Sequence, residues 1–318
     1  MKFITWNIVW NLCFGLLATL IVVGNLLTIW IFLKRRLRKR PHFLLISLAI
    51  ADLLVGLLTV PLYTAIYTYV QAYFLLTQLT DMFTGVGSIF GLAAISLERM
   101  YAIGWPFRHR TLKFRVYIFA VVMQWILAAI FTSIALLTSL SVLTWENFAY
   151  IQTLFLGTPL LVICIAYFVV WKKQNSMVDI QNHVVRETRL AKTLFIITAA
   201  SLLIWLPFQI LLVLLNFTQI RNQPHFNTTF FVIKLLQFSN SLVNVIIYPF
   251  RISEFKKALL QMNVDECRCN KGDFFRCFVV VRMCVLVVEE RKLCRCNKGD
   301  WVSFIIFKIY TFPIISEY

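Results

Sequence analysis

A long uncharged stretch at the start of the chain constrains its fold more than any other feature. From Trp6 to Leu33 the sequence holds no charged side chain. A bilayer span needs about 20 mostly apolar residues, so this stretch is long enough to cross a membrane. It is too long for the apolar region of a signal peptide, and no small-residue cleavage site precedes the basic cluster that follows it. We therefore expect an uncleaved first span.

The composition extends this reading to most of the chain. Of the 318 residues, 60% are apolar and 14% are charged. In soluble proteins about 45–50% of the residues are apolar and about 25% are charged. This balance argues against an ordinary soluble enzyme. We predict an all-α fold, a seven-transmembrane helix bundle. The expected spans cover residues 6–33, 43–70, 74–103, 116–143, 150–171, 193–216 and 228–250.

The net charge of +17 is explained by where the basic residues lie. Fifteen of the Lys and Arg residues fall in the links after spans one, three and five, and the opposite side holds only Lys2 and Arg221. Basic links stay in the cytoplasm, so we expect the N-terminus outside and the C-terminus inside. The lipid bilayer is thus an expected partner, and nucleic acid is not.

Three domains are expected along the chain. Residues 1–251 form the bundle, and residues 252–261 read as an amphipathic helix next to the membrane. The cytoplasmic tail, 262–318, contains Cys-Arg-Cys-Asn-Lys-Gly-Asp twice, at 267–273 and at 294–300. Palmitoylation and zinc binding are two interpretations of these cysteines. A duplicated tail without packed structure is the interpretation that we favour.

Polar residues and prolines mark every span. They are Gly24-Asn25, Asp52, Glu98-Arg99, Trp125, Pro159 with Tyr167, Trp205-Leu-Pro207, and Asn240 with Asn244-Val-Ile-Ile-Tyr248. In this order, over residues 15–260, the chain resembles the rhodopsin-like (class A) G-protein-coupled receptors. The branch is unassigned, because span three carries an amine-receptor-like Asp81 while the usual outer disulfide is missing. Phe74 stands at the matching cysteine position.

Asp52 lies in the middle of an apolar span. A bare buried carboxylate is costly, so it needs a cation, a proton or several donors. The resemblance implies a sodium ion held by Asp52, Ser88, Asn240 and Asn244, and we expect no other metal or cofactor. The alternative is that these residues act as polar contacts between helices.

The inner ends of the spans carry the residues of a switch. The resemblance implies that Arg99, next to Glu98, pairs with Glu187 in the resting state. It also implies that Tyr248 swings against Tyr167 on activation. Four positions depart from the family pattern: Met100 replaces a tyrosine, Ser201 a phenylalanine, Ile204 a cysteine and Val245 a proline, with a proline instead at position 249.

The expected ligand pocket lies at the outer ends of the spans. Asp81 would anchor a ligand ammonium, but Lys234 should lie across the pocket and could pair with that carboxylate instead. The other expected pocket residues are Gln152, Phe155, Trp205, Phe208 and Gln209. An amine, a peptide or other small molecule, and a lipid all stay open as ligands.

Together these observations predict a plasma-membrane receptor that binds an extracellular ligand and activates a heterotrimeric G protein. We find no nucleophile–base pair in the bundle, so an enzyme is not expected. A seven-span transporter or channel is the alternative, although no inverted repeat is visible. A light receptor is disfavoured, because Lys234 lies four residues before Phe238, the position of the opsin lysine.

Overall fold

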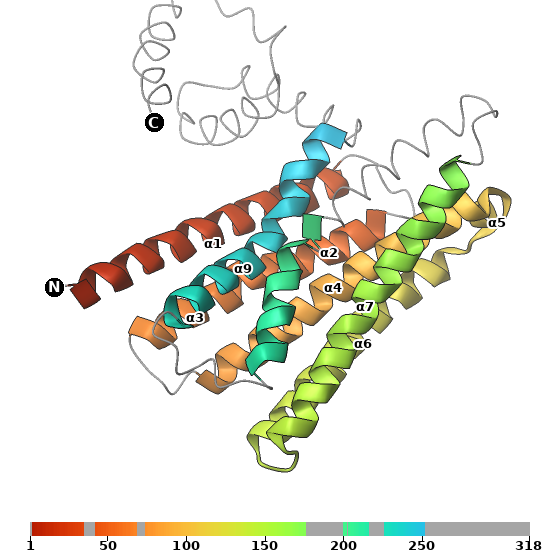
Figure 1. The fold of residues 1–318 in the computed structure, drawn as a ribbon. Coiled ribbons are helices and arrows are strands. Elements are labelled where there is room, and N and C mark those ends of the chain that lie inside the picture. The colour runs from red at the N-terminus through yellow and green to blue at the C-terminus, as the bar shows by residue number, and fades with distance from the viewer. Residues whose placement is uncertain are drawn as a thin grey trace, which may run out of the picture. The chain divides into compact units, whose positions relative to one another are not determined.

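The computed structural model describes residues 2–34, 42–68, 74–175, 200–201, 203–215 and 226–251. Every regular element within these ranges is a helix (Figure 1). In order they are α1 (Lys2–Lys34), α2 (His42–Leu54), η1 (Val55–Thr59), α3 (Val60–Thr68), α4 (Phe74–Gly104), α5 (Pro106–Thr111), α6 (Phe114–Ser139), α7 (Trp145–Asn175), a helix at Leu203–Leu215, and α9 (Phe226–Arg251). The chain divides into two compact units, Met1–Ala258 and Leu259–Tyr318, and all described residues belong to the first.

Six of the described helices are long and apolar enough to cross a membrane. They cover Ile8–Leu33, His42–Ala65, Phe74–Gly104, Phe114–Ser139, Glu146–Lys172 and Phe226–Ile246. Leu203–Leu215 is a shorter apolar helix within the sixth expected span. The all-α bundle is therefore confirmed. The expected helix at 252–261 and the tail at 262–318 lie outside the described residues, so the domain limits stay a prediction.

The predicted boundary between spans four and five is wrong. We expected span four at 116–143 and span five at 150–171, but α6 ends at Ser139 and α7 begins at Trp145. Ser141 turns the chain with a φ of 61°. The Thr144 hydroxyl accepts a hydrogen bond from the Asn147 N–H (3.4 Å), which suits a helix start. Capping thus extends α7 through polar residues that we had placed in the link.

The second span contains a wide turn that the hydropathy pattern did not predict. η1 is a π-helical turn, closed by the Val60 N–H donating to the Val55 carbonyl. Pro61 follows it. A proline has no N–H to donate, and its ring clashes with the carbonyl of the previous turn, so a wider turn relieves the clash. The turn begins three residues after Asp52 and displaces the outer half of the span relative to it.

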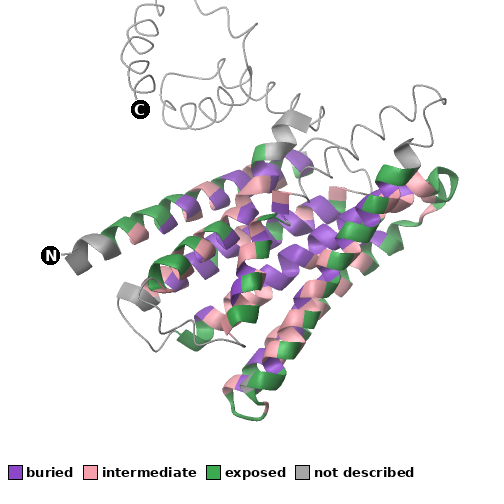
Figure 2. Cartoon of the chain, in the orientation of Figure 1, coloured by how far each residue is buried: buried purple, intermediate pink, exposed green. Residues whose placement is uncertain are grey.

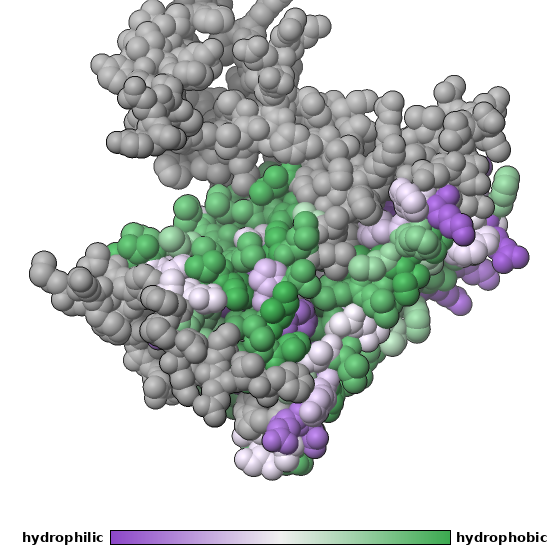
Figure 3. Space-filling model, in the orientation of Figure 1, coloured by the Kyte–Doolittle hydropathy of each residue, from purple (hydrophilic) through white to green (hydrophobic). Residues whose placement is uncertain are grey.

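Helix α4 lies in the middle of the bundle, in contact with α2, α6 and α7, while α1 packs on α2 and α9. Figure 2 shows buried residues along most of α4 and exposed residues on the outward faces of α1 and α6. Those outward faces are apolar, with Leu12 67% and Phe119 65% exposed. In Figure 3 the hydrophilic surface gathers around α5 and around the turn between α6 and α7. Lipid covers such an apolar belt in a membrane protein.

A polar network joins α2, α4 and α6. The Ser47 hydroxyl donates to Gln124 Oε1 (2.9 Å), the Trp125 indole donates to the Ser47 oxygen (3.1 Å), and the Gln124 amide donates to the Gly87 carbonyl (2.8 Å). Gly91 makes room for this amide, since a Cβ there would lie 2.9 Å from Gln124 Nε2. Polar contacts of this kind hold membrane helices together.

Candidate functional site

An ion pair joins α4 and α9 near the outer end of the bundle. Lys234 Nζ lies 2.5 Å from Asp81 Oδ2 and also donates to Gln237 Oε1 (3.0 Å). The Gln237 amide in turn donates to Asp81 Oδ1 (3.3 Å). We call Asp81, Lys234 and Gln237 the outer cluster. The pairing that we weighed against a ligand-bound Asp81 is thus present.

Aromatic rings surround the ammonium of the outer cluster. Lys234 Nζ lies 4.4 Å from the centre of the Phe208 ring and 5.5 Å from that of Phe238. Both distances allow cation–π attraction. The Trp205 ring packs edge-on against Phe208, with centroids 6.0 Å apart. It also lies over Gly85, where a Cβ would come within 3.3 Å of the ring.

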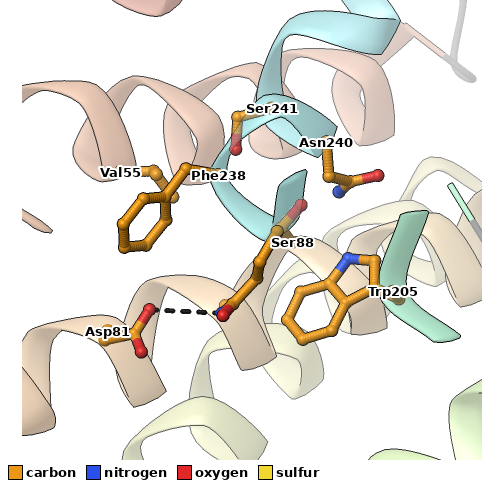
Figure 4. A pocket seen from close by; sticks show the side chains of 9 residues that line it. Val55, Asp81, Ser88, Trp205, Phe238, Asn240 and Ser241 are labelled. Carbon is orange, nitrogen blue, oxygen red and sulfur yellow. Dashed lines mark hydrogen bonds between the residues drawn. The ribbon is translucent and has the colours of Figure 1, made fainter. Parts of the chain in front are cut away.

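A small pocket extends from the outer cluster into the bundle (Figure 4). Figure 4 shows Asp81 at one side, the Trp205 ring at another, and Asn240 and Ser241 beyond them. Val55, Gly85, Ser88, Gln237 and Phe238 complete its lining. The pocket has room for about one water molecule.

Of the expected pocket residues, only Asp81 and Trp205 are in this lining. Lys234 and Phe208 contact each other outside it, and the other three are placed as follows. Phe155 stacks on Phe131 of α6 (4.8 Å between centroids) and tilts against Phe90 of α4 (5.3 Å), so it belongs to the apolar core. Gln152 is half-buried on the same helix, α7. Gln209 follows Phe208, and its Nε2 is buried without a hydrogen-bond partner among the described residues.

Asp52 lies at the centre of a second polar group, the midplane cluster, formed with Ser88, Asn240 and Asn244. Asp52 is fully buried. It accepts one hydrogen bond from the Ser88 hydroxyl (2.8 Å) and one from the Asn244 amide (2.8 Å). Asn240 is also buried, and it lines the pocket with Ser88. The structure therefore brings all four expected residues to one region of the bundle.

The midplane cluster is rich in acceptors. Asn25 donates its amide to the carbonyls of Ile21 (3.0 Å) and Ser241 (3.1 Å). The side-chain oxygens of Asn25, Asn240 and Asn244 are buried and have no donor among the described residues. Carboxylate, hydroxyl and amide oxygens are the donor set that a hard cation prefers. The residues present fit a small hard cation.

A third charged group lies at the inner end of α4. Arg99 Nε forms an ion pair with Glu98 Oε2 (2.5 Å), and both side chains are at most 10% exposed. The other Glu98 oxygen contacts His109 Nε2 of α5 at 2.8 Å. Tyr117 of α6 reaches the same ring nitrogen at 3.3 Å. Glu98 thus connects the arginine to the link after span three.

The remaining switch residues are placed only in part. Tyr167 is buried, and its hydroxyl accepts a hydrogen bond from the Ser96 hydroxyl (3.5 Å). Ser96 lies three residues before Arg99 on α4. Glu187 and the side chain of Tyr248 lie outside the described residues, so both pairings stay predictions. The Ser201 hydroxyl is buried without a partner in the described part of the chain.

Three residues of these groups were not assigned to a site from the sequence, although Gln237 and Ser241 stand out as polar residues of span seven. Gln237 follows Lys234 by three positions, and residues at that spacing share a helix face, so its contact with Asp81 could have been expected. Ser241 lines the pocket, four positions after Gln237 on the same face. His109 lies in the link, where no periodicity indicates which way a side chain points.

The comparisons with known proteins agree with this arrangement. The family model described as "7 transmembrane receptor (rhodopsin family)" matches residues 24–248. The chicken (Gallus gallus) adenosine receptor A2b is 25% identical over 312 residues, covering 82% of this chain and 90% of that receptor. The mouse (Mus musculus) trace amine-associated receptor 7b is 29% identical over 291 residues, covering 77% and 79%. The sheep (Ovis aries) adenosine receptor A3 is 28% identical over 273 residues, covering 75% and 84%. This chain belongs to the rhodopsin family of seven-transmembrane receptors.

Proposed function

We propose that this protein is a plasma-membrane receptor, not an enzyme, that binds an extracellular ligand at the outer cluster and activates a heterotrimeric G protein. In this proposal the N-terminus is outside and the C-terminus is cytoplasmic, as the basic links indicate. The relatives are named for adenosine and for trace amines. A small polar ligand is therefore favoured over a peptide or a lipid.

One observation carries the proposal: a single buried helix has a charged group at each end. Asp81 and Arg99 both lie on α4, and at 1.5 Å per residue they are about 27 Å apart along its axis. A ligand that contacts Asp81 therefore acts on the same rigid element that holds Arg99. Coupling between distant sites needs an element of this kind whose position both sites can bias.

Trp205 supplies the second connection between the ligand and the inner end. Its ring lines the pocket beside Asp81, and Pro207 follows two residues later. Proline removes one helical hydrogen bond and bends a helix. A ligand that displaces the Trp205 ring would change this bend and move the inner end of the same helix. The G protein would bind in the space that opens next to Arg99.

The midplane cluster is proposed to hold a sodium ion between the two ends. Asp52, Ser88, Asn240 and Asn244 would hold it, and the unpaired amide oxygens described above support this assignment. The ion would neutralise the buried Asp52 carboxylate, which has no cationic side chain paired with it in the described residues. A bound ion would thereby favour the helix arrangement in which these residues are close together.

The proposal is tested without any ligand by changing the Glu98–Arg99 pair. Wild type, Glu98→Gln and Arg99→Ala are expressed in cells that carry biosensors for each G-protein class, with surface expression matched. Glu98→Gln releases the arginine, so we expect its basal signal to rise severalfold. Arg99→Ala is expected to abolish the signal. Equal signals from all three at matched surface expression, across every sensor, would overturn the proposed function.

A further inference from the structure

The outer cluster contains one acidic and one basic side chain that neutralise each other. Asp81 is 19% exposed and Lys234 is 7% exposed, and Gln237 bonds to both. We propose that the ligand of this site is a small zwitterion that carries an ammonium and a carboxylate together with an apolar or aromatic side group. This inference rests on the proposed function, in which the outer cluster receives the ligand.

A ligand with a single charge would leave this site unbalanced. A monoamine bound to Asp81 would take the carboxylate from Lys234, whose ammonium lies against the Phe208 and Phe238 rings. No second carboxylate is paired with Lys234 in the described residues. Separating a buried pair and leaving one charge uncompensated is strongly unfavourable. A monocarboxylate bound to Lys234 would leave Asp81 in the same position.

A zwitterion replaces both partners at once. Its ammonium takes the place of Lys234 at Asp81, and its carboxylate takes the place of Asp81 at Lys234. The number of buried ion pairs rises from one to two, and no charge is left alone. Gln237, which both donates and accepts, can bond to either group of the ligand.

The surroundings of the outer cluster determine the rest of the ligand. Trp205, Phe208 and Phe238 present ring surface beside it, which suits an apolar or aromatic side group. The Trp205 Nε1 donor, from a residue of the pocket lining, is buried and has no partner among the described residues. Additional acceptor oxygens, such as those of a carboxylate, would satisfy donors of this kind.

Three compounds with one ring and one chain test the inference on the wild-type receptor. They are phenylalanine, phenethylamine, which lacks the carboxylate, and 3-phenylpropionate, which lacks the ammonium. A wider panel of α-, β- and γ-amino acids is run with the matching amines and acids. We expect at least one zwitterion to activate, and its single-charge analogues to be at least about a hundredfold less potent.

Near-isosteric variants of Asp81 and Lys234 are expected to shift the ligand preference of the receptor from the zwitterion to a single-charge analogue. Lys234→Gln leaves Asp81 without its partner, so this variant is expected to gain a response to the amine that matches the active zwitterion. Asp81→Asn is expected to gain a response to the matching carboxylate. The double variant is expected to lose the zwitterion response. If a single variant fails to reach the surface, the potency order on the wild type alone decides.

The inference is overturned if an amine or a carboxylate activates the wild type as well as its zwitterion does. It is also overturned if the wild type is silent to the whole zwitterion panel. The basal effects of Glu98→Gln and Arg99→Ala need no ligand, so they report on the proposed function separately. If the basal signals change as expected but the zwitterion is not the most potent ligand, the proposed function stands and only the zwitterion inference is overturned.

Discussion

The outer cluster and the midplane cluster each centre on one aspartate, but they balance its charge differently. Asp81 has the ammonium of Lys234 beside it. Among the described residues, Asp52 has neutral hydroxyl and amide donors and no cationic side chain, and unpaired amide oxygens are buried in the same region. The outer cluster therefore holds both charges, whereas in the midplane cluster we propose that a cation from outside the protein balances the carboxylate.

This difference indicates how each site should respond to solutes. A site that already contains both charges exchanges partners only with a molecule that carries both. A site with an unbalanced carboxylate attracts a simple cation, since an isolated buried charge is unfavourable. The following predictions test this contrast, beginning with the largest expected effect.

Lys234→Ala should destabilise the receptor most, because it leaves the Asp81 carboxylate buried without its partner. We expect a loss of about 3 kcal/mol in the free energy of unfolding, measured as a lower unfolding temperature in detergent. Removing both charges in Lys234→Ala with Asp81→Ala should be less damaging than the single change. A double variant no more stable than Lys234→Ala would contradict a charge-balanced pair.

Gly24→Ala should disturb the midplane cluster by separating α1 from α9. The new Cβ would lie 2.5 Å from Val245 Cγ1, next to Asn244. Overpacking of this kind costs about 1–3 kcal/mol, and Val245→Ala should restore the loss. Gly15→Ala is the matched control on the same helix, since nothing lies within 4 Å of its Cβ position. Equal destabilisation by both alanines would show that close approach is not the cause.

Asp52→Asn should weaken the effect of sodium on signalling, while Asp81→Asn should preserve it. The measurement is basal nucleotide exchange on membranes, with sodium replaced by an organic cation. Coupling between two sites in one protein is typically about 1–3 kcal/mol, so we expect the sodium concentration for half effect to rise about tenfold. Unchanged sodium dependence in Asp52→Asn would remove sodium from the midplane cluster.

Gln237→Leu should have the smallest effect, because the ion pair of the outer cluster survives without it. Losing the hydrogen bonds of one buried amide costs about 1 kcal/mol. Gln152→Leu is the control, since that half-buried glutamine lies outside the pocket lining. A loss of stability in the control as large as in Gln237→Leu would show that the amide of Gln237 has no special role.

Much of this arrangement could be predicted because polar residues are conspicuous in apolar helices. The resemblance implied a cluster of Asp52, Ser88, Asn240 and Asn244 from three long spans, and they do lie in one region. The Asp81–Lys234 contact was one of two alternatives that the sequence offered for Asp81, and it is the one present in the structure. A buried charge must find a partner, so its presence in the sequence already limits where the partner can be.

Other features depend on local geometry that hydropathy does not report. The start of α7 is determined by capping at Thr144, and the π-helical turn by Pro61. Phe155 was expected in the pocket, but an aromatic residue on a span can pack against any apolar neighbour, and here it stacks on Phe131. His109, which contacts Glu98, lies on the short helix α5. The direction of that helix depends on the chain on both sides of it.

If the ligand binds at the outer cluster as proposed, the contact between Lys234 and Asp81 also determines how concentrated that ligand must be. The Lys234 ammonium, which is part of the protein, competes with the ligand ammonium for the Asp81 carboxylate. A ligand binds only to the molecules in which the pair is open. Its apparent dissociation constant is therefore the intrinsic constant divided by the fraction of open molecules. If about one molecule in a hundred were open, a site with intrinsic micromolar affinity would respond at about a hundredfold higher concentration. Such a receptor would respond only to a ligand that is abundant outside the cell.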